Sequence, residues 1–196
     1  VCSRRDADKL IEQGKVLVNG QVAGMGQQVE ETDTVQVGKN ILQGKQTQKV
    51  LAFYKPVGVT CTERDPHAEK KIMDMIRYPE RLTYAGRLDK DSEGLILLTN
   101  DGDLINAMMR GANRHEKEYI VKTDKEITPD FLEKMAKGIY LKDLDITTRE
   151  CEIEQIGKFT FRIVLTQGVN RQIRRMCEAC GYRVKALKRI RIINIL

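Results

Sequence analysis

A short loop crowded with charged residues is the first candidate for chemistry in this chain of 196 residues. Three carboxylates, Asp89, Asp91 and Glu93, stand directly before the apolar run 94–98. A loop at the end of a rigid strand is a common place for catalytic groups. Carboxylates there can act as nucleophile, general base or charge stabiliser. The residue types alone do not choose among the three, and a solvated acidic turn is the competing interpretation.

A pair of cysteines is the second candidate. Cys177 and Cys180 have the C-x-x-C spacing of half a zinc site. A second pair is missing from the sequence, and His67 and His115 do not cluster with the two thiols. We therefore predict a pair of thiols buried on a helix and no metal. The odd total of five cysteines indicates reduced thiols and a cytoplasmic location.

The charge balance favours a polyanionic partner, because the net charge is +6 and the pI is near 9.0. Basic residues gather near the carboxyl end, where Glu178 is the single acidic residue between positions 170 and 191. No apolar run approaches the roughly 20 residues that a membrane helix needs. We therefore expect contact with nucleic acid and no membrane association.

The first 44 residues are predicted to form a small module. Ser3 is suited to cap a helix that ends at Gly14. Asn19-Gly20 between two apolar runs is typical of a two-residue β-hairpin turn. The alternating residues 34–37 predict a further strand.

A polar stretch at 39–49 is expected to link this module to a larger domain at 49–196. Strands separated by helices, with hairpins, predict an α+β fold with a mixed, largely antiparallel sheet. The predicted strands are 50–54, 94–98, 119–121, 150–156, 160–165 and 190–196, and the predicted helices are 102–110, 129–137 and 171–180.

The order of residues in the charged loop resembles a known catalytic signature. Gly86-Arg87-Leu88-Asp89 followed by KDSEGLILLTN is similar to the signature of the small-subunit-type (RsuA-type) branch of RNA pseudouridine synthases. Within that family the chain looks closest to the F-type large-subunit synthases. The opening segment, from Cys2 to Gly20, resembles an S4 RNA-binding domain, which often precedes this catalytic domain.

The resemblance implies roles for three residues. The Asp of the family signature is the essential carboxylate, which is Asp89 here. The stretch HEKEY resembles the element whose Tyr packs on the target base, which assigns Tyr119. The stretch NRQIRRM resembles the segment whose Arg pairs with the catalytic Asp, which assigns Arg174. We expect no cofactor, since the reaction involves no redox change and no transfer to another molecule.

Phosphate contacts are expected from basic residues near these motifs and in the first module. Lys55, in a Lys-Pro-x-Gly segment like that of the family, has a simple turn role as its alternative. Arg87 has a structural ion pair as its alternative. The candidate RNA-binding residues are Arg4, Arg5, Lys9, Lys15, Lys55, Arg87, Lys117, Arg171, Arg175 and Lys188.

The expected reaction moves the ribose C1′ from N1 to C5 of the same uracil. Asp89 would act as a nucleophile at the sugar or as a base at C2′, and the sequence leaves both routes open. Either route needs an ionised carboxylate, which an adjacent guanidinium favours. Tyr119 would stack on the detached uracil and help to remove the C5 proton. A stacked uridine must first be flipped out, at a cost of a few kcal/mol.

We therefore expect an enzyme that isomerises uridine in structured RNA, either ribosomal RNA of the large subunit or transfer RNA, and acts as a monomer. One alternative is a non-catalytic RNA-binding or ribosome-assembly protein that retains the fold. Another is a glycosidase that releases free uracil. The intact Asp89, Tyr119 and Arg174 favour the isomerase.

Overall fold

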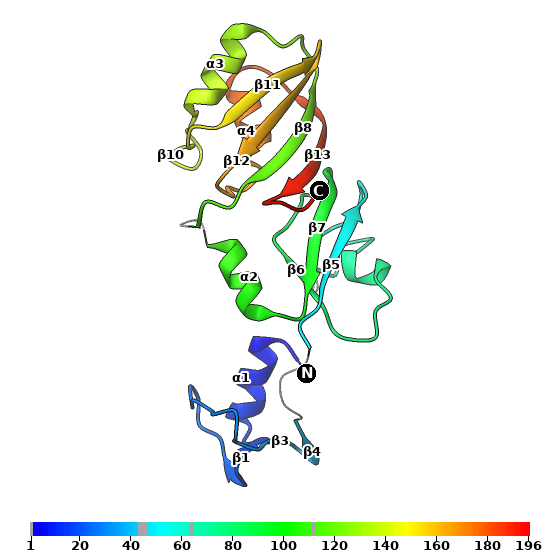
Figure 1. The fold of residues 1–196 in the computed structure, drawn as a ribbon, viewed down its shortest axis with the longest axis vertical. Helices are drawn as coiled ribbons and strands as arrows, with labels where there is room; N and C mark the ends of the chain where they lie inside the picture. Colours follow the sequence, from blue (N-terminus) through cyan, green and yellow to red (C-terminus); the bar gives the residue numbers. More distant parts are fainter. Residues whose placement is uncertain (1, 43–46, 63–64, 111–112) are drawn as a thin grey trace. The chain divides into compact units, whose positions relative to one another are not determined.

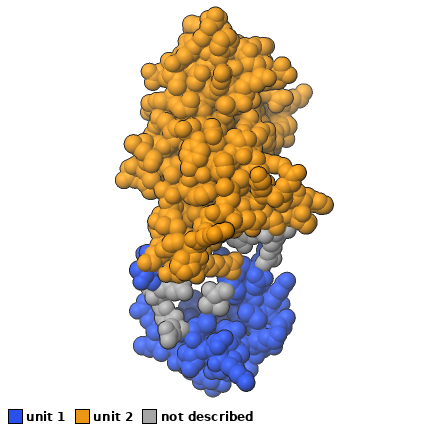
Figure 2. Space-filling model, turned by 90° about the vertical axis from the view of Figure 1, so that its right-hand side faces the viewer, with its two compact units in different colours: residues 1–48 blue, residues 49–196 orange. Residues whose placement is uncertain are grey.

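The computed structural model describes residues 2–42, 47–62, 65–110 and 113–196. The chain divides into two compact units, residues 1–48 and 49–196, which Figure 2 colours separately. The predicted end of the first module at residue 44 lies outside the described residues. Among the described helices, none is long and apolar enough to cross a membrane.

The first unit is one helix against a small antiparallel sheet. Ser3 caps helix α1 (Arg4–Glu12) by accepting a hydrogen bond from the amide of Asp6 at 3.2 Å. Asn19 and Gly20 both have positive φ, as the predicted hairpin turn requires. The sheet has the order β2-β1-β3-β4. Its strands are β1 (Val16–Val18), β2 (Gln21–Val22), β3 (Val35–Val37) and β4 (Asn40–Ile41).

The second unit is built on a seven-stranded sheet of order β11-β12-β8-β13-β7-β5, with β6 also paired to β7. A separate two-stranded sheet joins β9 and β10. The strands are β5 (Val50–Lys55), β6 (Thr83–Ala85), β7 (Glu93–Thr99), β8 (Lys117–Thr123), β9 (Tyr140–Leu141), β10 (Ile146–Thr147), β11 (Glu152–Gly157), β12 (Thr160–Leu165) and β13 (Val184–Ile192). The helices are the 3-10 helix η1 (Ile72–Met75), α2 (Gly102–Met109), α3 (Pro129–Lys137) and α4 (Gln172–Ala179).

Two antiparallel halves meet at one parallel pairing, between β13 and β7. Helices α3 and α4 pack on one face of the β11-β12-β8-β13 half, around Phe131, Phe161 and Met176 (Figure 1). A second apolar cluster, around Ile72 and Ile96, lies under β5 and β7. Helix α2 covers the other face of β7. The fold is therefore mixed α+β with a mainly antiparallel sheet, as the sequence predicts.

The structure confirms most predicted elements within a few residues, and it corrects one. The final strand runs over 184–192 rather than 190–196. The side chains of Leu187 and Arg189 point to the interior, and that of Lys188 points to solvent. Because one of the two buried side chains is charged, the alternation of apolar and polar residues that predicts a strand is lost from the sequence. The chain then leaves the strand at Ile193, which has a positive φ of 56°.

Gly94 is the point where the two halves of the sheet come closest. It pairs with Lys55 of β5 on one side and with Arg189 of β13 on the other. A Cβ atom at Gly94 would lie 2.1 Å from the carbonyl oxygen of Arg189. Its φ of +113° is also strained for any residue with a side chain. The close approach of β7 and β13 therefore requires glycine here.

We expect Gly94→Ala to cost more free energy of unfolding than the roughly 1 kcal/mol of an average point mutation, because backbone rather than a side chain fills the space. Gly102→Ala is the matched control, since a Cβ there meets nothing within 4 Å. Urea unfolding followed by circular dichroism measures both variants. Equal unfolding midpoints for the two would contradict the close approach.

Candidate active site

The loop between β6 and β7 carries Asp89 at the meeting point of the two halves. The amide of Ser92 donates to the carbonyl of Asp89 at 3.1 Å, which closes a turn within the loop. The amide of Gly58 donates to the carbonyl of Lys90 at 2.7 Å and ties the loop to the turn after β5. The Asp89 side chain is 32% exposed, so it is held by its neighbours and still accessible.

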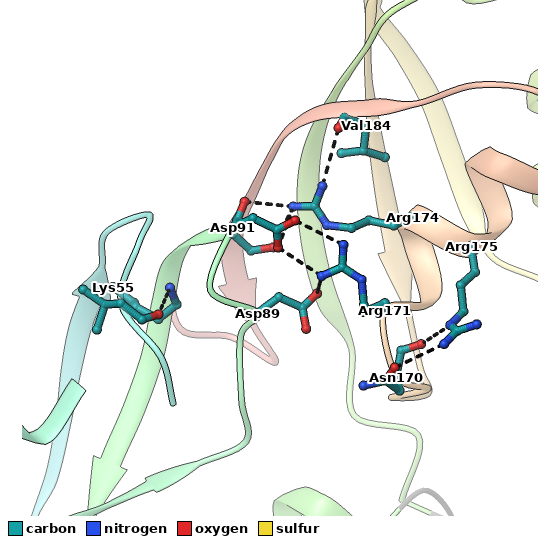
Figure 3. A network of polar contacts seen from close by, with 10 residues as sticks. Lys55, Asp89, Asp91, Asn170, Arg171, Arg174, Arg175 and Val184 are labelled. Atoms are coloured by element: carbon teal, nitrogen blue, oxygen red, sulfur yellow. Dashed lines mark hydrogen bonds and ion pairs between the residues drawn. The ribbon is translucent and has the colours of Figure 1, made fainter. Parts of the chain in front are cut away.

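Two arginines from the start of α4 reach into this loop (Figure 3). Arg171 makes two hydrogen bonds to the carboxylate of Asp91, at 3.2 and 3.1 Å. Arg174 donates from Nη2 to the carbonyl of Asp91 at 2.8 Å and to Ser92 Oγ at 3.1 Å, and lies 3.2 Å from Asp91 Oδ1. Asp91 is therefore the shared acceptor of both guanidinium groups.

The expected ion pair between Asp89 and Arg174 is not formed; Asp89 lies near Arg171 instead, and Arg174 pairs with Asp91. The guanidinium nearest to Asp89 belongs to Arg171, with 3.7 Å between Nη1 and Oδ2. Arg174 lies one turn further along α4, is only 13% exposed and meets Asp91 instead. The turn from Asp89 to Ser92 explains this, because it places the carboxylate of Asp91 against the guanidinium groups of both arginines. The motif located the segment correctly but not the partner.

The charges of this network shift the pKa of Asp91 downward and oppose the fall that burial causes in the pKa of Arg174. Burial would raise the pKa of Asp91, but the hydrogen bond from Arg171 and the charge of Arg174 together lower it below its usual value. Burial lowers the pKa of Arg174, while the charge of Asp91 opposes that shift. Arginine stays protonated in proteins, so both guanidinium groups remain cationic beside Asp89.

Arg171, which contacts the loop, has an unusual backbone conformation. It precedes α4 at the N-cap position with φ 51° and ψ 32°, in the left-handed region. Such a conformation costs a non-glycine residue about 1–3 kcal/mol and is concentrated at functional sites. Here it accompanies the ion pair with Asp91.

Tyr119 lies on the interior-facing side of β8, where it packs against both apolar clusters of the second unit. Its strand partner on β13 is Arg189, which in turn pairs with Gly94 at the exit of the Asp89 loop. The ring therefore lies at the seam between the halves, across Arg189 from the point where the Asp89 loop enters β7. An aromatic ring there can provide a face for a flat base.

The RNA contact expected of Lys55 is wrong in this structure. Lys55 is fully buried, and its ammonium donates to the carbonyls of Pro56 at 2.9 Å and Val59 at 2.7 Å. Burial lowers the pKa of Lys55, and the charge of Asp89 is among the groups that oppose this shift. Lys55 therefore shapes the turn that holds Lys90, which agrees with its alternative role as a turn residue.

The other predicted RNA contacts divide by their exposure. Arg87 and Arg171 are exposed beside Asp89. Lys117 is half-buried, and its ammonium donates to the carbonyl of His115 at 3.1 Å. Arg175 turns away from Asp89 to Asn170 and an ion pair with Asp143.

Lys188 and the basic residues of the first unit lie elsewhere. Lys188 is exposed on the opposite sheet face from Tyr119, with its ammonium 5.2 Å from the ring centre of Tyr54. All four predicted contacts of the first unit are exposed, namely Arg4, Arg5, Lys9 and Lys15. Their contacts with RNA stay predictions.

The prediction of two buried helix thiols holds for Cys177 within α4, whereas Cys180 lies at the end of that helix and is only half-buried. All five cysteines are free thiols. Cys177 is buried, and burial raises its pKa to about 12. Within the described part of the chain, no group of three or more His, Cys, Asp or Glu residues could hold a metal ion.

Comparison with known proteins agrees with this geometry. A family model described as RNA pseudouridylate synthase matches residues 49–179, and an S4 domain model matches residues 1–35. The chain belongs to the RNA pseudouridine synthase family. It is therefore an RNA pseudouridine synthase with an S4 domain at its amino end, and the network around Asp89 lies in its catalytic domain.

Relatives with curated names support the same assignment. The dual-specificity RNA pseudouridine synthase RluF of Escherichia coli strain K12 is 46% identical over 197 residues, which span 100% of this chain and 67% of that protein. The ribosomal large subunit pseudouridine synthase B of Yersinia pestis is 35% identical, over 98% of this chain and 64% of that protein. A crystal structure of a pseudouridylate synthase covers 97% of this chain and 83% of its own, with a TM-score of 0.71 and 27% identity.

The lowered pKa of Asp91 gives its contribution to stability a defined pH dependence. A carboxylate whose pKa is lower in the folded than in the unfolded protein stabilises the fold above its unfolded pKa of about 3.9. That contribution is lost as the pH falls through the folded pKa. We expect the difference in unfolding free energy between wild type and Asp91→Asn to be constant from about pH 5 to 7 and to shrink at about pH 3. Denaturant titrations at each pH measure it, and a difference that grows at low pH would refute this account.

Proposed function

We propose that this pseudouridine synthase modifies uridine in ribosomal RNA of the large subunit, with transfer RNA as a second substrate. The named functions of its relatives support this assignment, because one is called dual-specificity and another is named for the large ribosomal subunit. The proposal covers the choice of RNA, since isomerisation itself follows from the family.

Asp89 is the proposed catalytic carboxylate. The observation that carries this role is its position: it is accessible, 3.7 Å from the Arg171 guanidinium, and on the loop that leads into β7 beside the pairing of Tyr119 with Arg189. The Arg171 charge attracts the ionised carboxylate, which both chemical routes require. At the ribose, Asp89 acts as a nucleophile at C1′ or as a base at C2′. In each route the N1–C1′ bond breaks, and a C5–C1′ bond forms.

Tyr119 is proposed to stack on the uracil while the base turns from N1 to C5. Its position between the two apolar clusters keeps the ring fixed. The tyrosine hydroxyl would relay the C5 proton at the end of the reaction, passing its own proton to solvent as it takes up the one from C5, and N1 would gain a proton from solvent. The sum is an isomerisation in which no redox equivalent is consumed.

We expect Asp89→Asn to abolish isomerisation while leaving the dissociation constant for RNA within about threefold, since the fold and the arginines remain. Tritium release from large-subunit ribosomal RNA labelled at uridine C5 measures the activity, and filter binding measures affinity. Asp103→Asn is the matched control, because this exposed carboxylate on α2 undergoes the same chemical change.

Three outcomes separate the alternatives. Full activity of Asp89→Asn would refute its catalytic role. Binding without tritium release by the wild type would favour an RNA-binding protein that retains the fold. Free uracil among the products would favour a glycosidase.

The basic residues of the first unit should contribute to RNA binding through phosphate contacts. Replacing Arg4, Arg5, Lys9 and Lys15 together by Gln is expected to reduce the slope of log affinity against log salt by about one for each phosphate that the variant no longer neutralises. The control replaces Lys134 and Lys137, which are exposed on α3 and ion-paired with Asp130 and Glu133. Equal slopes for the two variants would exclude the first unit from the RNA interface.

A further inference from the structure

Arg189 is a buried cation at the seam of the sheet. It is 2% exposed, although it belongs to the basic stretch near the carboxyl end. Within the described residues, no carboxylate lies within ion-pair distance of its guanidinium, and its Nη2 has no hydrogen-bond partner. A buried charge without a carboxylate partner lowers stability, so its presence calls for another explanation.

The hydrogen bonds of Arg189 supply that explanation. Its Nε donates to the carbonyl of Leu95 at 2.7 Å, and its Nη1 approaches the carbonyl of Arg87 at 3.5 Å. These two carbonyls lie on either side of Asp89 along the chain. The guanidinium thereby joins the entry and the exit of the catalytic loop.

The short pairing of β13 with β7 explains what these contacts add. Strands β13 and β7 pair at only two positions, Lys188 with Glu93 and Arg189 with Gly94. Beyond Gly94 the backbone ladder between them ends, and the Arg189 side chain binds Leu95 where a strand amide would otherwise do so. The requirement for glycine at Gly94 follows from the same close approach.

Arg189 also lies beside the residues that face the target base. It pairs with Tyr119 across the two strands, and Lys117 is two residues from Tyr119 on the same face of β8. The charge of Arg189 adds to burial in lowering the pKa of Lys117. The guanidinium is thus close to the base-facing side of the seam, although its own atoms are covered.

We propose that Arg189 is a positioning residue, which fixes the loop of Asp89 against β13 so that the carboxylate is aimed at the ribose. This inference rests on the proposed role of Asp89. It assigns to Arg189 no contact with RNA, because its side chain is enclosed. Misplacement of a catalytic group by about 1 Å can cost a hundredfold in rate, so loss of this clamp should affect chemistry more than binding.

The test compares Arg189→Met, which keeps the bulk and removes the donors, with Arg189→Lys, which keeps one donor. Single-turnover tritium release is measured with enzyme in excess over C5-tritiated large-subunit ribosomal RNA. We expect Arg189→Met to slow the rate at saturating enzyme by about tenfold or more, with an RNA dissociation constant within about threefold of wild type. Arg189→Lys should restore part of the rate.

A control for simple destabilisation is Leu132→Ala, which loosens the packing of α3, the helix that contacts the edge strand β11 at the far end of the sheet from β7. It should unfold more easily and keep the wild-type single-turnover rate. Hydrogen exchange should show faster exchange in Arg189→Met at the loop amides, such as Ser92, and not in β12.

The outcomes distinguish this inference from the proposed function. An Arg189→Met enzyme as fast as wild type would overturn the positioning role alone. A rate that falls equally in Leu132→Ala would overturn it as well, since stability would then explain the loss. A wild type that releases no tritium would instead refute the proposed function.

Discussion

The close approach of two backbones at Gly94 and Arg189 is the constraint on which the rest of the site depends. It joins the half of the sheet that carries Tyr119 to the half that carries the Asp89 loop. The α4 arginines belong to the first half, and the carboxylates that they meet belong to the second. Because the pairing spans only two positions, small changes in this contact would move one set of groups relative to the other.

Two buried cations, Lys55 and Arg189, lie next to the strand that follows the Asp89 loop. Lys55 and Arg189 both pair in register with Gly94, from opposite sides, and both bind backbone carbonyls rather than carboxylates. Carbonyl oxygens accept from Lys55 and from part of the Arg189 guanidinium, and neither cation has a carboxylate partner at ion-pair distance within the described residues. Two buried cations therefore lie on either side of the strand that follows the Asp89 loop, and their charge favours the approach of a polyanion.

Much of the fold could be predicted from the sequence because its signals are local. Ser3, Asn19-Gly20 and Pro129 mark element boundaries through capping and turn chemistry that needs no tertiary context. The motifs located Asp89, Tyr119 and the α4 arginines. The partner of Arg174 could not be predicted, because the choice between Asp91 and Asp89 depends on how the loop turns toward α4.

The burial of Lys55 and Arg189 contradicts the usual behaviour of charged residues. For Arg189 a signal existed, since it lies two residues after the buried Leu187 on the same strand.

The sharing of Asp91 by two arginines has a consequence for discrimination among anions. With Asp91 bound to both side chains, any phosphate group that seeks them must first compete with a carboxylate already in place. A single phosphate brings few charges to this competition, whereas a long polyanion gains affinity from many distant charges at once. The internal carboxylate thus weights these two guanidinium groups toward polymeric rather than small anions.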